Sequence, residues 1–212
     1  MPMQNTTLNH SELLYLHAEK YVPEGSFLQF KEELPNGKKL NANKFGNLVS
    51  EAAFAHLYFN GHIDLEIKTK KTLGIFSKQV VVSNKKSDGT GLTSLEKAIF
   101  DLSDGLEVST ILYRVIGDEC SSPWSVVVEV VKKSLVNKEF LTVETITKKI
   151  IVSYNTYKYH LNPSKNIDFK DEIIEMDNKM KEFSNKDFYK LLVKSIDSGI
   201  ASQKEKPDTS SD

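Results

Sequence analysis

A long apolar helix face that ends in Asn60-Gly61 constrains the fold of this chain more than any other feature. Residues 45–59 place apolar side chains at the 3.6-residue period of an amphipathic helix. Glycine readily adopts the left-handed conformation that closes a helix, so this dipeptide marks its end. Residues 63–67 then alternate apolar and charged side chains, which is the period of a half-buried strand. The sequence therefore predicts a buried helix followed at once by a β-hairpin over residues 63–83.

Further helices and a second hairpin follow from the same periodicities. We expect Ser11 and Ser184 to cap two helices, and Thr93 with Glu96 to form a capping box, in which each side chain bonds the other residue's backbone N–H. Residues 140–154 are expected to form the second hairpin, from segments 140–143 and 149–154. Apolar spacing and helix-start signals predict helices over residues 11–20, 93–102, 108–115, 124–137, 169–183 and 184–196.

The length of 212 residues suits one domain. We expect a flexible arm over residues 1–10, a folded domain over residues 11–201 and a disordered tail over residues 202–212, because both ends are polar and lack apolar anchors. A brief extended segment is expected near Phe27. The expected fold class is mostly α with two β-hairpins, in a single domain.

Charge and cysteine content exclude several classes of protein. The 28 basic residues nearly balance 29 acidic ones, whereas nucleic-acid binders are usually strongly basic. Arg114 is the single arginine, so a site that needs the planar guanidinium fork has one candidate. One cysteine, Cys120, allows no intramolecular disulfide. No apolar run approaches the roughly 18–20 residues of a membrane-spanning helix, and the first ten residues lack a signal core, so we expect a soluble or membrane-peripheral protein.

The sequence carries no recognisable catalytic or metal-binding motif. Its five histidines lack the spacing of a zinc site, and no GxGxxG, GxxxxGK[ST] or GxSxG motif occurs. Carboxylates are numerous but fall at expected helix ends and loops. We therefore predict a protein that is not an enzyme, with no catalytic residue, no metal and no cofactor.

One pattern leaves a winged-helix-like nucleic-acid binder as an alternative. The expected helix over residues 124–137 precedes the second hairpin, and lysines lie on both elements, as in a helix followed by a wing. These are Lys132 and Lys133 on the helix and Lys148 and Lys149 on the hairpin. Such lysines would contact phosphates in a salt-dependent way. A solvated helix face explains them as well, and the balanced charge of the chain favours that reading, with no nucleic-acid partner.

Several segments resemble, in order, the Golgi phosphoprotein 3 family. The run Phe59-Asn60-Gly61-His62-Ile63-Asp64-Leu65-Glu66 ends a helix and opens a strand as in that family, and a basic hairpin follows over residues 68–82. The opening helix, a loop, a later helix and the start of the second hairpin also match. They are Ser11-Glu12-Leu13-Leu14, Ser87-Asp88-Gly89-Thr90-Gly91-Leu92, Leu95-Glu96-Lys97-Ala98-Ile99 and Lys133-Ser134-Leu135-Val136-Asn137-Lys138-Glu139-Phe140-Leu141-Thr142.

The resemblance covers residues 11–162 and implies a divergent, C-terminally shortened relative with a single Golgi phosphoprotein 3-like helical domain. Members of that family are peripheral proteins on the cytoplasmic side of Golgi membranes, where they bind phosphatidylinositol 4-phosphate. They also bridge the cytosolic tails of Golgi glycosyltransferases to coatomer and so retain these enzymes. The resemblance thus implies an adaptor in vesicle transport whose basic and aromatic side chains capture a lipid phosphate, while a hydrophobic loop meets the headgroups.

The lipid pocket implied by the resemblance departs from the family's residues. The family's tryptophan falls at Asn41 and an arginine at Ser50, and two further arginines fall at Val128 and Val131. Either nearby lysines substitute as point charges, or they are ordinary surface lysines, which is the favoured alternative. Binding is weaker in both cases, because each lost charge-assisted hydrogen bond is worth about 1.5–3 kcal/mol. The candidate lipid-binding residues are Asn41, Lys44, Ser50, Val128, Lys132 and Lys133.

A second reading keeps the fold without the lipid. The chain would then be a protein-interaction module that binds protein tails or associates with itself along the first hairpin. Self-association predicts a homo-oligomer. Its candidate residues are Lys68, Lys70, Lys71, Leu73 and Phe76.

Overall fold

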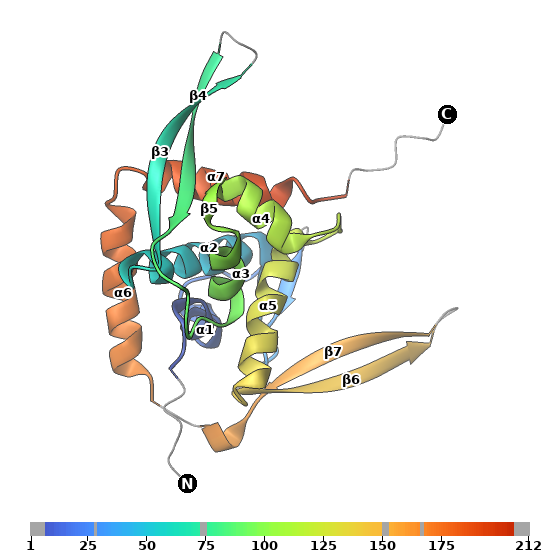
Figure 1. Cartoon of the computed structure of the whole chain (residues 1–212). Coiled ribbons are helices and arrows are strands. Elements are labelled where there is room, and N and C mark those ends of the chain that lie inside the picture. The colour runs from blue at the N-terminus through green and yellow to red at the C-terminus, as the bar shows by residue number, and fades with distance from the viewer. Residues whose placement is uncertain (1–6, 28, 73–75, 150–152, 166–167, 206–212) are drawn as a thin grey trace, which may run out of the picture.

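The chain forms a helical body from which two β-hairpins project (Figure 1). A computed structural model describes residues 7–27, 29–72, 76–149, 153–165 and 168–205. The helices are α1 (His10–Leu16), α2 (Ala42–Phe59), α3 (Ser94–Leu102), α4 (Val108–Ile116), α5 (Pro123–Asn137), α6 (Lys170–Ser184) and α7 (Tyr189–Ala201), with 3₁₀ turns at Ala18–Lys20 and Pro163–Lys165. The strands are β1 (Lys31–Glu33), β2 (Lys39–Asn41), β3 (Ile63–Thr72), β4 (Phe76–Lys85), β5 (Asp104–Glu107), β6 (Leu141–Lys149) and β7 (Ser153–Leu161).

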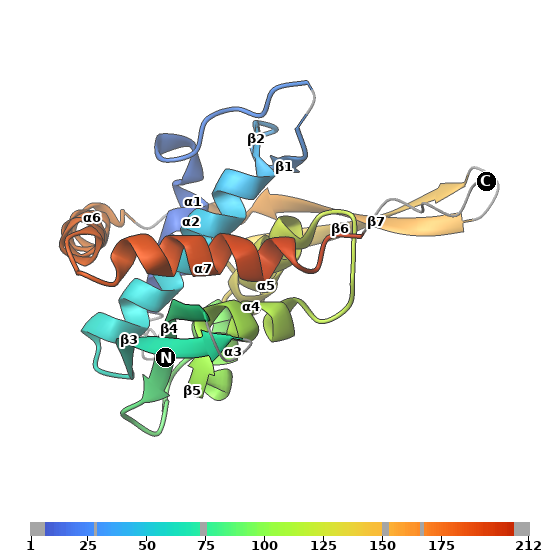
Figure 2. The ribbon, with the colours of Figure 1, turned by 90° about the horizontal axis from the view of Figure 1, so that it is seen from above.

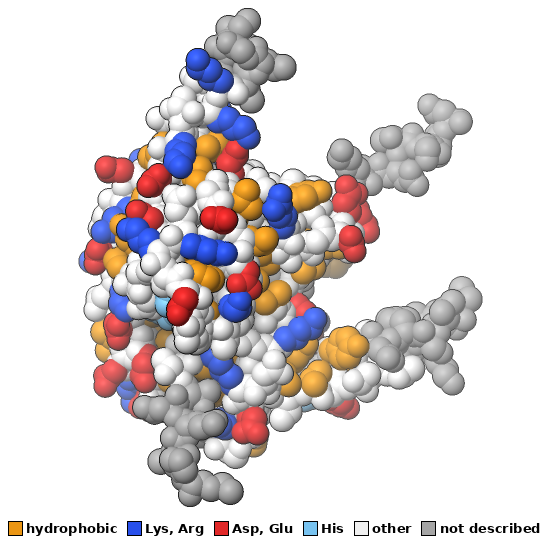
Figure 3. Space-filling model, in the orientation of Figure 1, with side chains coloured by type: hydrophobic (Ala, Val, Ile, Leu, Met, Phe, Trp, Pro, Cys, Tyr) orange, Lys and Arg blue, Asp and Glu red, His pale blue; other side chains and the backbone are white. Residues whose placement is uncertain are grey.

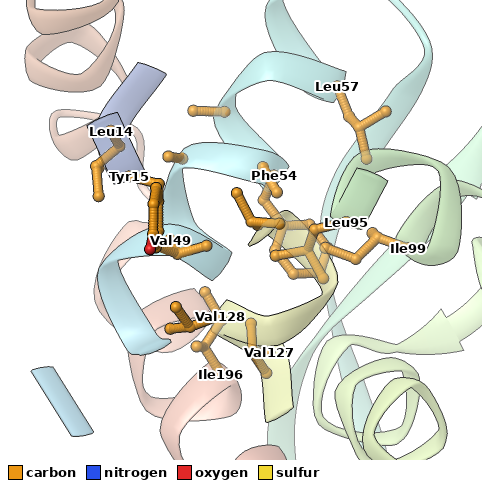
Figure 4. Close-up of a cluster of buried hydrophobic side chains, with 14 of the residues drawn as sticks. Leu14, Tyr15, Val49, Phe54, Leu57, Leu95, Ile99, Val127, Val128 and Ile196 are labelled. Carbon is orange, nitrogen blue, oxygen red and sulfur yellow. The ribbon is translucent and has the colours of Figure 1, made fainter. Parts of the chain in front are cut away.

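Helix α2 runs through the core, as its apolar periodicity predicts. Its buried side chains, among them Val49 and Phe54, meet side chains of α1, α3, α5 and α7 (Figure 4). Asn41 caps the helix, because its side-chain oxygen accepts the backbone N–H of Lys44 at 3.0 Å. Gly61, with φ of +70°, follows the last turn and directs the chain into β3. The predicted order of buried helix and hairpin is confirmed.

Two glycines allow helices to approach more closely than any side chain would permit. A Cβ atom at Gly46 of α2 would lie 2.8 Å from the Cβ atom and the carbonyl oxygen of Trp124 in α5. A Cβ atom at Gly199 of α7 would lie 2.5 Å from the carbonyl oxygen of Ser109 in α4. These contacts seat α5 on α2 and α7 on α4, and α7 crosses the body against both α4 and α2 (Figure 2).

Both predicted hairpins are present, and their strands are longer than the sequence pattern indicates. β3 and β4 pair from Ile63, opposite Lys85, to their tip, and β5 joins β4 as a third strand. β6 and β7 pair from Leu141, opposite Leu161. The second hairpin differs from the expected one because residues 144–148, expected to connect its strands, lie within β6, and β7 continues to Leu161. Backbone pairing continues through the polar residues 144–148, which apolar patterning does not mark as a strand. A third small sheet pairs β1 with β2. The coarse prediction of a mostly helical chain with two hairpins is confirmed.

The N-terminal arm predicted for residues 1–10 is corrected for its last residues. Leu8 is buried, and α1 begins at His10 with Asn9 as its cap, not with Ser11. The apolar Leu8 packs into the core and so anchors the segment. Residues 1–6 lie outside the described part of the chain.

The expected capping box of Thr93 and Glu96 is replaced by a link between helices. Thr93 precedes α3 as predicted, but the Glu96 carboxylate accepts the backbone N–H of Ser11 at 3.1 Å and its hydroxyl at 2.8 Å. A carboxylate cap occurs at α1 instead, where Glu12 accepts the backbone N–H of Asn9 at 2.8 Å. Ser11 competes successfully for Glu96 because tertiary packing brings α1 against α3.

Two further helix limits differ from the prediction. Helix α1 ends at Leu16, and a 3₁₀ turn continues it to Lys20. Ser184 does not cap the last helix, because it is the final residue of α6 and its hydroxyl donates to the carbonyl oxygen of Lys181 at 2.7 Å. Helix α7 begins only at Tyr189.

The disordered tail predicted for residues 202–212 is corrected up to residue 205. Gln203 is 1% exposed, and its amide donates to the carbonyl oxygen of Tyr113 at 3.0 Å and to that of Gly117. The backbone N–H of Cys120 donates to the carbonyl oxygen of Gln203 at 2.9 Å. A polar residue thus anchors this segment, which an apolar pattern could not reveal. Residues 206–212 lie outside the described part.

Candidate functional site

Two cavities open where hairpin β6–β7 leaves the body, and Tyr157 and Tyr159 line both. The first cavity, about 300 Å³, lies between β1 and β7 with Lys132 of α5 in its wall. The second, about 490 Å³, lies between the hairpin and α5, with Val143 and Lys133 in its wall. Figure 3 shows hydrophobic side chains gathered on this part of the hairpin, where Val143 is 44% and Tyr157 60% exposed. Concave surfaces with apolar and polar walls are the usual binding regions of proteins.

A buried ionic cluster forms the inner wall of the first cavity. The Lys132 ammonium group pairs with Glu32 of β1 and lies 3.6 Å from the Glu129 carboxylate. It also sits 4.8 Å from the ring centroid of Tyr159, whose hydroxyl donates to Glu129. The side chains of Lys132 and Glu32 are 9% and 8% exposed. Buried ion pairs persist where further interactions compensate the charges, and here Glu129 gives the Lys132 ammonium group a second carboxylate.

Two phenols border this cluster and stay protonated. Burial, followed by the charges of Glu32 and Glu129, raises the pKa of Tyr15. Burial, followed by the hydrogen bond to Glu129, raises the pKa of Tyr159. The Tyr15 hydroxyl is buried without a hydrogen-bond partner among the described residues. Two carboxylates surround the one ammonium group, so the cluster offers no unpaired positive charge to a phosphate.

The six residues expected to bind lipid do not meet at one surface. Ser50 and Val128 are both 0% exposed, and the Ser50 hydroxyl donates to the carbonyl oxygen of Gly46 at 2.9 Å. They support the packing of α2 and α5 and lie where a headgroup does not reach. Lys132 is held in the ionic cluster, whereas its neighbour Lys133 is exposed.

The remaining two expected residues lie at the start of α2. Besides capping the helix, Asn41 donates from its side-chain amide to the side-chain oxygen of Gln29 at 2.6 Å. This bond ties the loop before β1 to the first turn of α2, where Lys44 is exposed. Asn41 therefore has a structural role, and Lys44 is the charge that remains available.

The loop before β1 carries two exposed aromatic side chains. The sequence predicted only a brief extended segment here. Phe27 is 94% exposed and Phe30 is 45% exposed. The Lys204 ammonium group lies 5.6 Å from the ring centroid of Phe30. We call Phe27, Phe30, Lys44 and Lys204 the loop face. The turn before Phe27 was the one sequence signal that could have placed this aromatic at a surface.

The basic hairpin β3–β4 carries its lysines on exposed strands. Lys68 pairs with Glu66 at 3.6 Å, and Lys70 pairs with Glu107 of β5 at 2.5 Å. Lys71 is exposed and forms no ion pair within the part of the chain that the structure describes. Exposed pairs of this kind contribute about 0–1 kcal/mol, so these lysines remain available to a partner.

At the tip of that hairpin, Leu73 lies outside the described residues. Phe76 opens β4, opposite Thr72. β3 is one of the two edge strands of its sheet, and edge strands can pair with another chain. Self-association along this hairpin stays a prediction.

A second buried charge cluster links α1, α3 and α5. Burial, followed by the neighbouring charge of Glu12, raises the pKa of Glu96 to about 7. Glu12 accepts the hydroxyl of Ser134 at 2.7 Å and pairs with Lys138 at 2.7 Å. These groups bond to one another across three helices, which gives the cluster a structural role.

Helix α5 offers little free positive charge for the winged-helix-like alternative. Lys132 is buried in ion pairs, so Lys133 alone of this pair reaches solvent. The side chains of Lys148 and Lys149 lie outside the described part. The absence of a nucleic-acid partner remains a prediction.

Among the described residues, no group of three or more His, Cys, Asp and Glu side chains is arranged to hold a metal ion. None of the helices in that same part is both long enough and apolar enough to cross a bilayer. Comparison of the chain with protein-family models, with curated proteins and with solved structures found no match.

Proposed function

We propose that this chain is a peripheral membrane adaptor that binds bilayers containing phosphatidylinositol 4-phosphate through its loop face. The observation that carries the proposal is Phe27, a large apolar side chain that is 94% exposed. An aromatic side chain gains free energy when it enters the boundary between headgroups and acyl chains. Full burial of a phenylalanine side chain is worth about 1.5–3 kcal/mol.

Two exposed lysines near this loop supply attraction to anionic lipid: Lys204 lies 5.6 Å from the ring centroid of Phe30, and Lys44 lies in the first turn of α2. Lys44 and Lys204 are exposed on the loop face. Each lysine close to an anionic membrane surface contributes about 1 kcal/mol, and salt screens that contribution. Lysine is a point charge without the geometry of a guanidinium fork. The binding should therefore depend on total lipid charge and ionic strength, with modest preference among phosphoinositide headgroups.

The resemblance of residues 11–162 to the Golgi phosphoprotein 3 family supports the cellular part of the proposal. It favours a fold of that type, a place on the cytoplasmic side of Golgi membranes, and a bridge between glycosyltransferase tails and coatomer. The helical body with two hairpins is consistent with such a fold in its coarse form. The basic hairpin β3–β4 would then be free for a protein partner or a second copy.

Vesicle flotation tests the membrane proposal. The full chain is mixed with phosphatidylcholine vesicles, with vesicles that also hold phosphatidylinositol 4-phosphate, and with vesicles of equal charge made with phosphatidylserine. We expect binding to both anionic vesicles that falls between low and high salt. Phe27→Ser should weaken it about tenfold, because the buried phenyl ring is lost.

Ile174→Ser is the matched control, because Ile174 is also an exposed apolar residue, 59% exposed, but lies on α6. This variant should float as the unaltered chain does. The proposal fails if no anionic vesicle is bound at low salt. It also fails if Phe27→Ser and Ile174→Ser float equally well.

A second candidate function, a protein-interaction module without lipid binding, is favoured by the ionic cluster. Glu32 and Glu129 satisfy Lys132, so the cation nearest the expected lipid pocket is not available to a phosphate. The cavities beside β7 nevertheless stay open. If the chain does not bind anionic vesicles but binds a peptide in the first cavity, it has this second function.

A further inference from the structure

Two strands leave an edge unpaired on the two sides of the 300 Å³ cavity. Among the described residues, β1 pairs with β2 and β7 pairs with β6, and each has no second strand partner. Residues 31–33 of β1 with the following Leu34, and residues 156–159 of β7, line the cavity, together with Lys132 of α5 and Ile146 of β6. We call this cavity the strand slot. Unpaired strand edges carry rows of free N–H and C=O groups that can bind another strand.

Hydrogen bonds at both ends of β1 show which of its backbone groups face the slot. The Leu34 N–H donates to the carbonyl oxygen of Lys38 at 2.8 Å, and the Ala42 N–H donates to that of Phe30 at 3.0 Å. Antiparallel pairing alternates, so residues 30, 32 and 34 bond toward β2. Lys31 and Glu33 therefore direct their backbone N–H and C=O groups to the other side, and both residues line the slot.

The same reasoning applies to β7. The Asn162 N–H donates to the carbonyl oxygen of Phe140 at 3.0 Å. Hydrogen-bonded positions alternate along an antiparallel strand, so residues 160, 158 and 156 also bond toward β6. Tyr157 and Tyr159 therefore direct their backbone groups away from β6, and both line the slot. The slot thus has backbone donors and acceptors on both of its walls.

Side-chain charge indicates which kind of strand fits. Lys132 in the slot wall is neutralised by Glu32, and Glu33 pairs with Lys39 at 3.4 Å. Lys31 on β1 and Lys158 on β7 are exposed and form no ion pair in the described ranges. The slot is thus lined by two lysines without a carboxylate partner among the described residues, one on each strand, and by Tyr157, which is 60% exposed.

We infer that the strand slot binds an extended, acidic segment of a partner protein, which adds one strand between β1 and β7. The segment would join the sheets in the order β2, β1, segment, β7, β6, with backbone hydrogen bonds to both neighbours. Its carboxylates would meet Lys31 and Lys158, and its apolar side chains would contact Tyr157. This inference deepens the second candidate function and requires no membrane binding.

Fluorescence anisotropy with a labelled ten-residue peptide of alternating valine and glutamate tests the inference. Tyr157→Pro removes the N–H that faces the slot and leaves the ladder to β6 intact. Thr145→Pro is the matched control, because Thr145 lies opposite Tyr157 and its N–H faces the outer edge of β6. Tyr157→Ala separates loss of the ring from loss of the N–H. A peptide methylated on alternate backbone nitrogens tests the same bonds on the unaltered chain.

We expect saturable binding of the acidic peptide and none of a valine–lysine peptide. Tyr157→Pro should weaken binding about tenfold relative to Tyr157→Ala, because backbone hydrogen bonds are lost, whereas Thr145→Pro should not weaken it. Lys158→Glu should weaken it as well. The inference is overturned if the acidic peptide does not bind, if the methylated peptide binds equally, or if Thr145→Pro weakens binding as much as Tyr157→Pro.

The same variants keep this inference separate from membrane binding. Tyr157→Pro should still float with anionic vesicles, and Phe27→Ser should still bind the peptide. If the unaltered chain binds the peptide but no anionic vesicle, the membrane proposal alone is refuted. If it binds anionic vesicles but not the peptide, the inference about the strand slot alone is refuted.

Discussion

Lowering the pH from 8 to 5 is expected to destabilise this protein through two buried histidines, His10 and His56. Their rings meet edge to face with centroids 4.8 Å apart. The Nδ1 atom of each is buried without a hydrogen-bond partner among the described residues. Burial, followed by the charge of Lys179, lowers the pKa of His10 to about 4. Burial, followed by the charge of His10, lowers the pKa of His56 to about 3.

The sign and size of the effect follow from these values. Both folded-state pKa values lie below the ordinary 6.5, so the unfolded chain binds protons first as the pH falls. Stability is complete above about pH 6.5 and is lost as the pH falls toward 4 and 3. Linkage gives a loss of about 2 kcal/mol for each ring at pH 5. Glu96 opposes this loss, because its raised pKa of about 7 lets the folded state hold a proton that the unfolded state releases. Its contribution over the same interval is about 2–3 kcal/mol.

Urea unfolding at pH 8 and pH 5 separates these contributions. The change in unfolding free energy is compared between the unaltered chain, His10→Gln and His56→Gln, so that the contribution of Glu96 cancels. Each variant should lose about 2 kcal/mol less between the two pH values than the unaltered chain does. His160→Gln on β7 controls for the removal of a histidine as such. A buried-site variant that loses as much as the unaltered chain would refute the reasoning.

Three further predictions concern packing, charge and the C-terminal anchor. Gly46→Ala should lower the urea midpoint by the equivalent of about 1–3 kcal/mol, because its Cβ atom would meet Trp124 at 2.8 Å. Lys132→Met should cost about 3–5 kcal/mol in urea unfolding, since it leaves buried carboxylates without their cation, and adding Glu32→Gln should restore part of the loss. Gln203→Ala should cost about 1–3 kcal/mol and increase amide hydrogen exchange at the end of α4, because two buried carbonyl oxygens lose their donor.

Sequence signals within a single element predicted the helices, but they located the ends of those helices least reliably. The apolar period of α2 and the stop at Gly61 depend on neighbouring residues, so the sequence contained both. Helix α5 was predicted despite its many valines, because spacing outweighed their modest helix propensity. Ser11 and Ser184 were both assigned as caps, yet each hydroxyl bonds elsewhere. A serine has several possible partners, and tertiary packing decides among them.

The candidate site was much less predictable, because its chemistry depends on residues distant in sequence. Lys132 and Lys133 are adjacent and chemically identical, yet one pairs with Glu32, 100 residues away, and the other reaches solvent. The free edges of β1 and β7 depend equally on which strands fail to pair. Near Phe27, only the preceding turn indicates a surface position for its ring, and that signal is weak because apolar residues usually indicate burial.

The positions of the lysines show what a single arginine implies for the ligands of this chain. Lys132, which is buried near the expected lipid pocket, is neutralised by carboxylates, while the lysines free to meet a ligand, such as Lys44, Lys133 and Lys158, lie on different helices and strands. Isolated ammonium groups do not fix the orientation of one phosphate as a guanidinium fork does. They suit ligands that repeat their charge along a surface or a strand, such as an anionic bilayer or an acidic extended segment. The two surfaces proposed for these ligands share no residue, because Phe27 and Lys44 serve one while Tyr157 and Lys158 serve the other. One chain could therefore hold a membrane and a partner protein at the same time, which is what an adaptor must do.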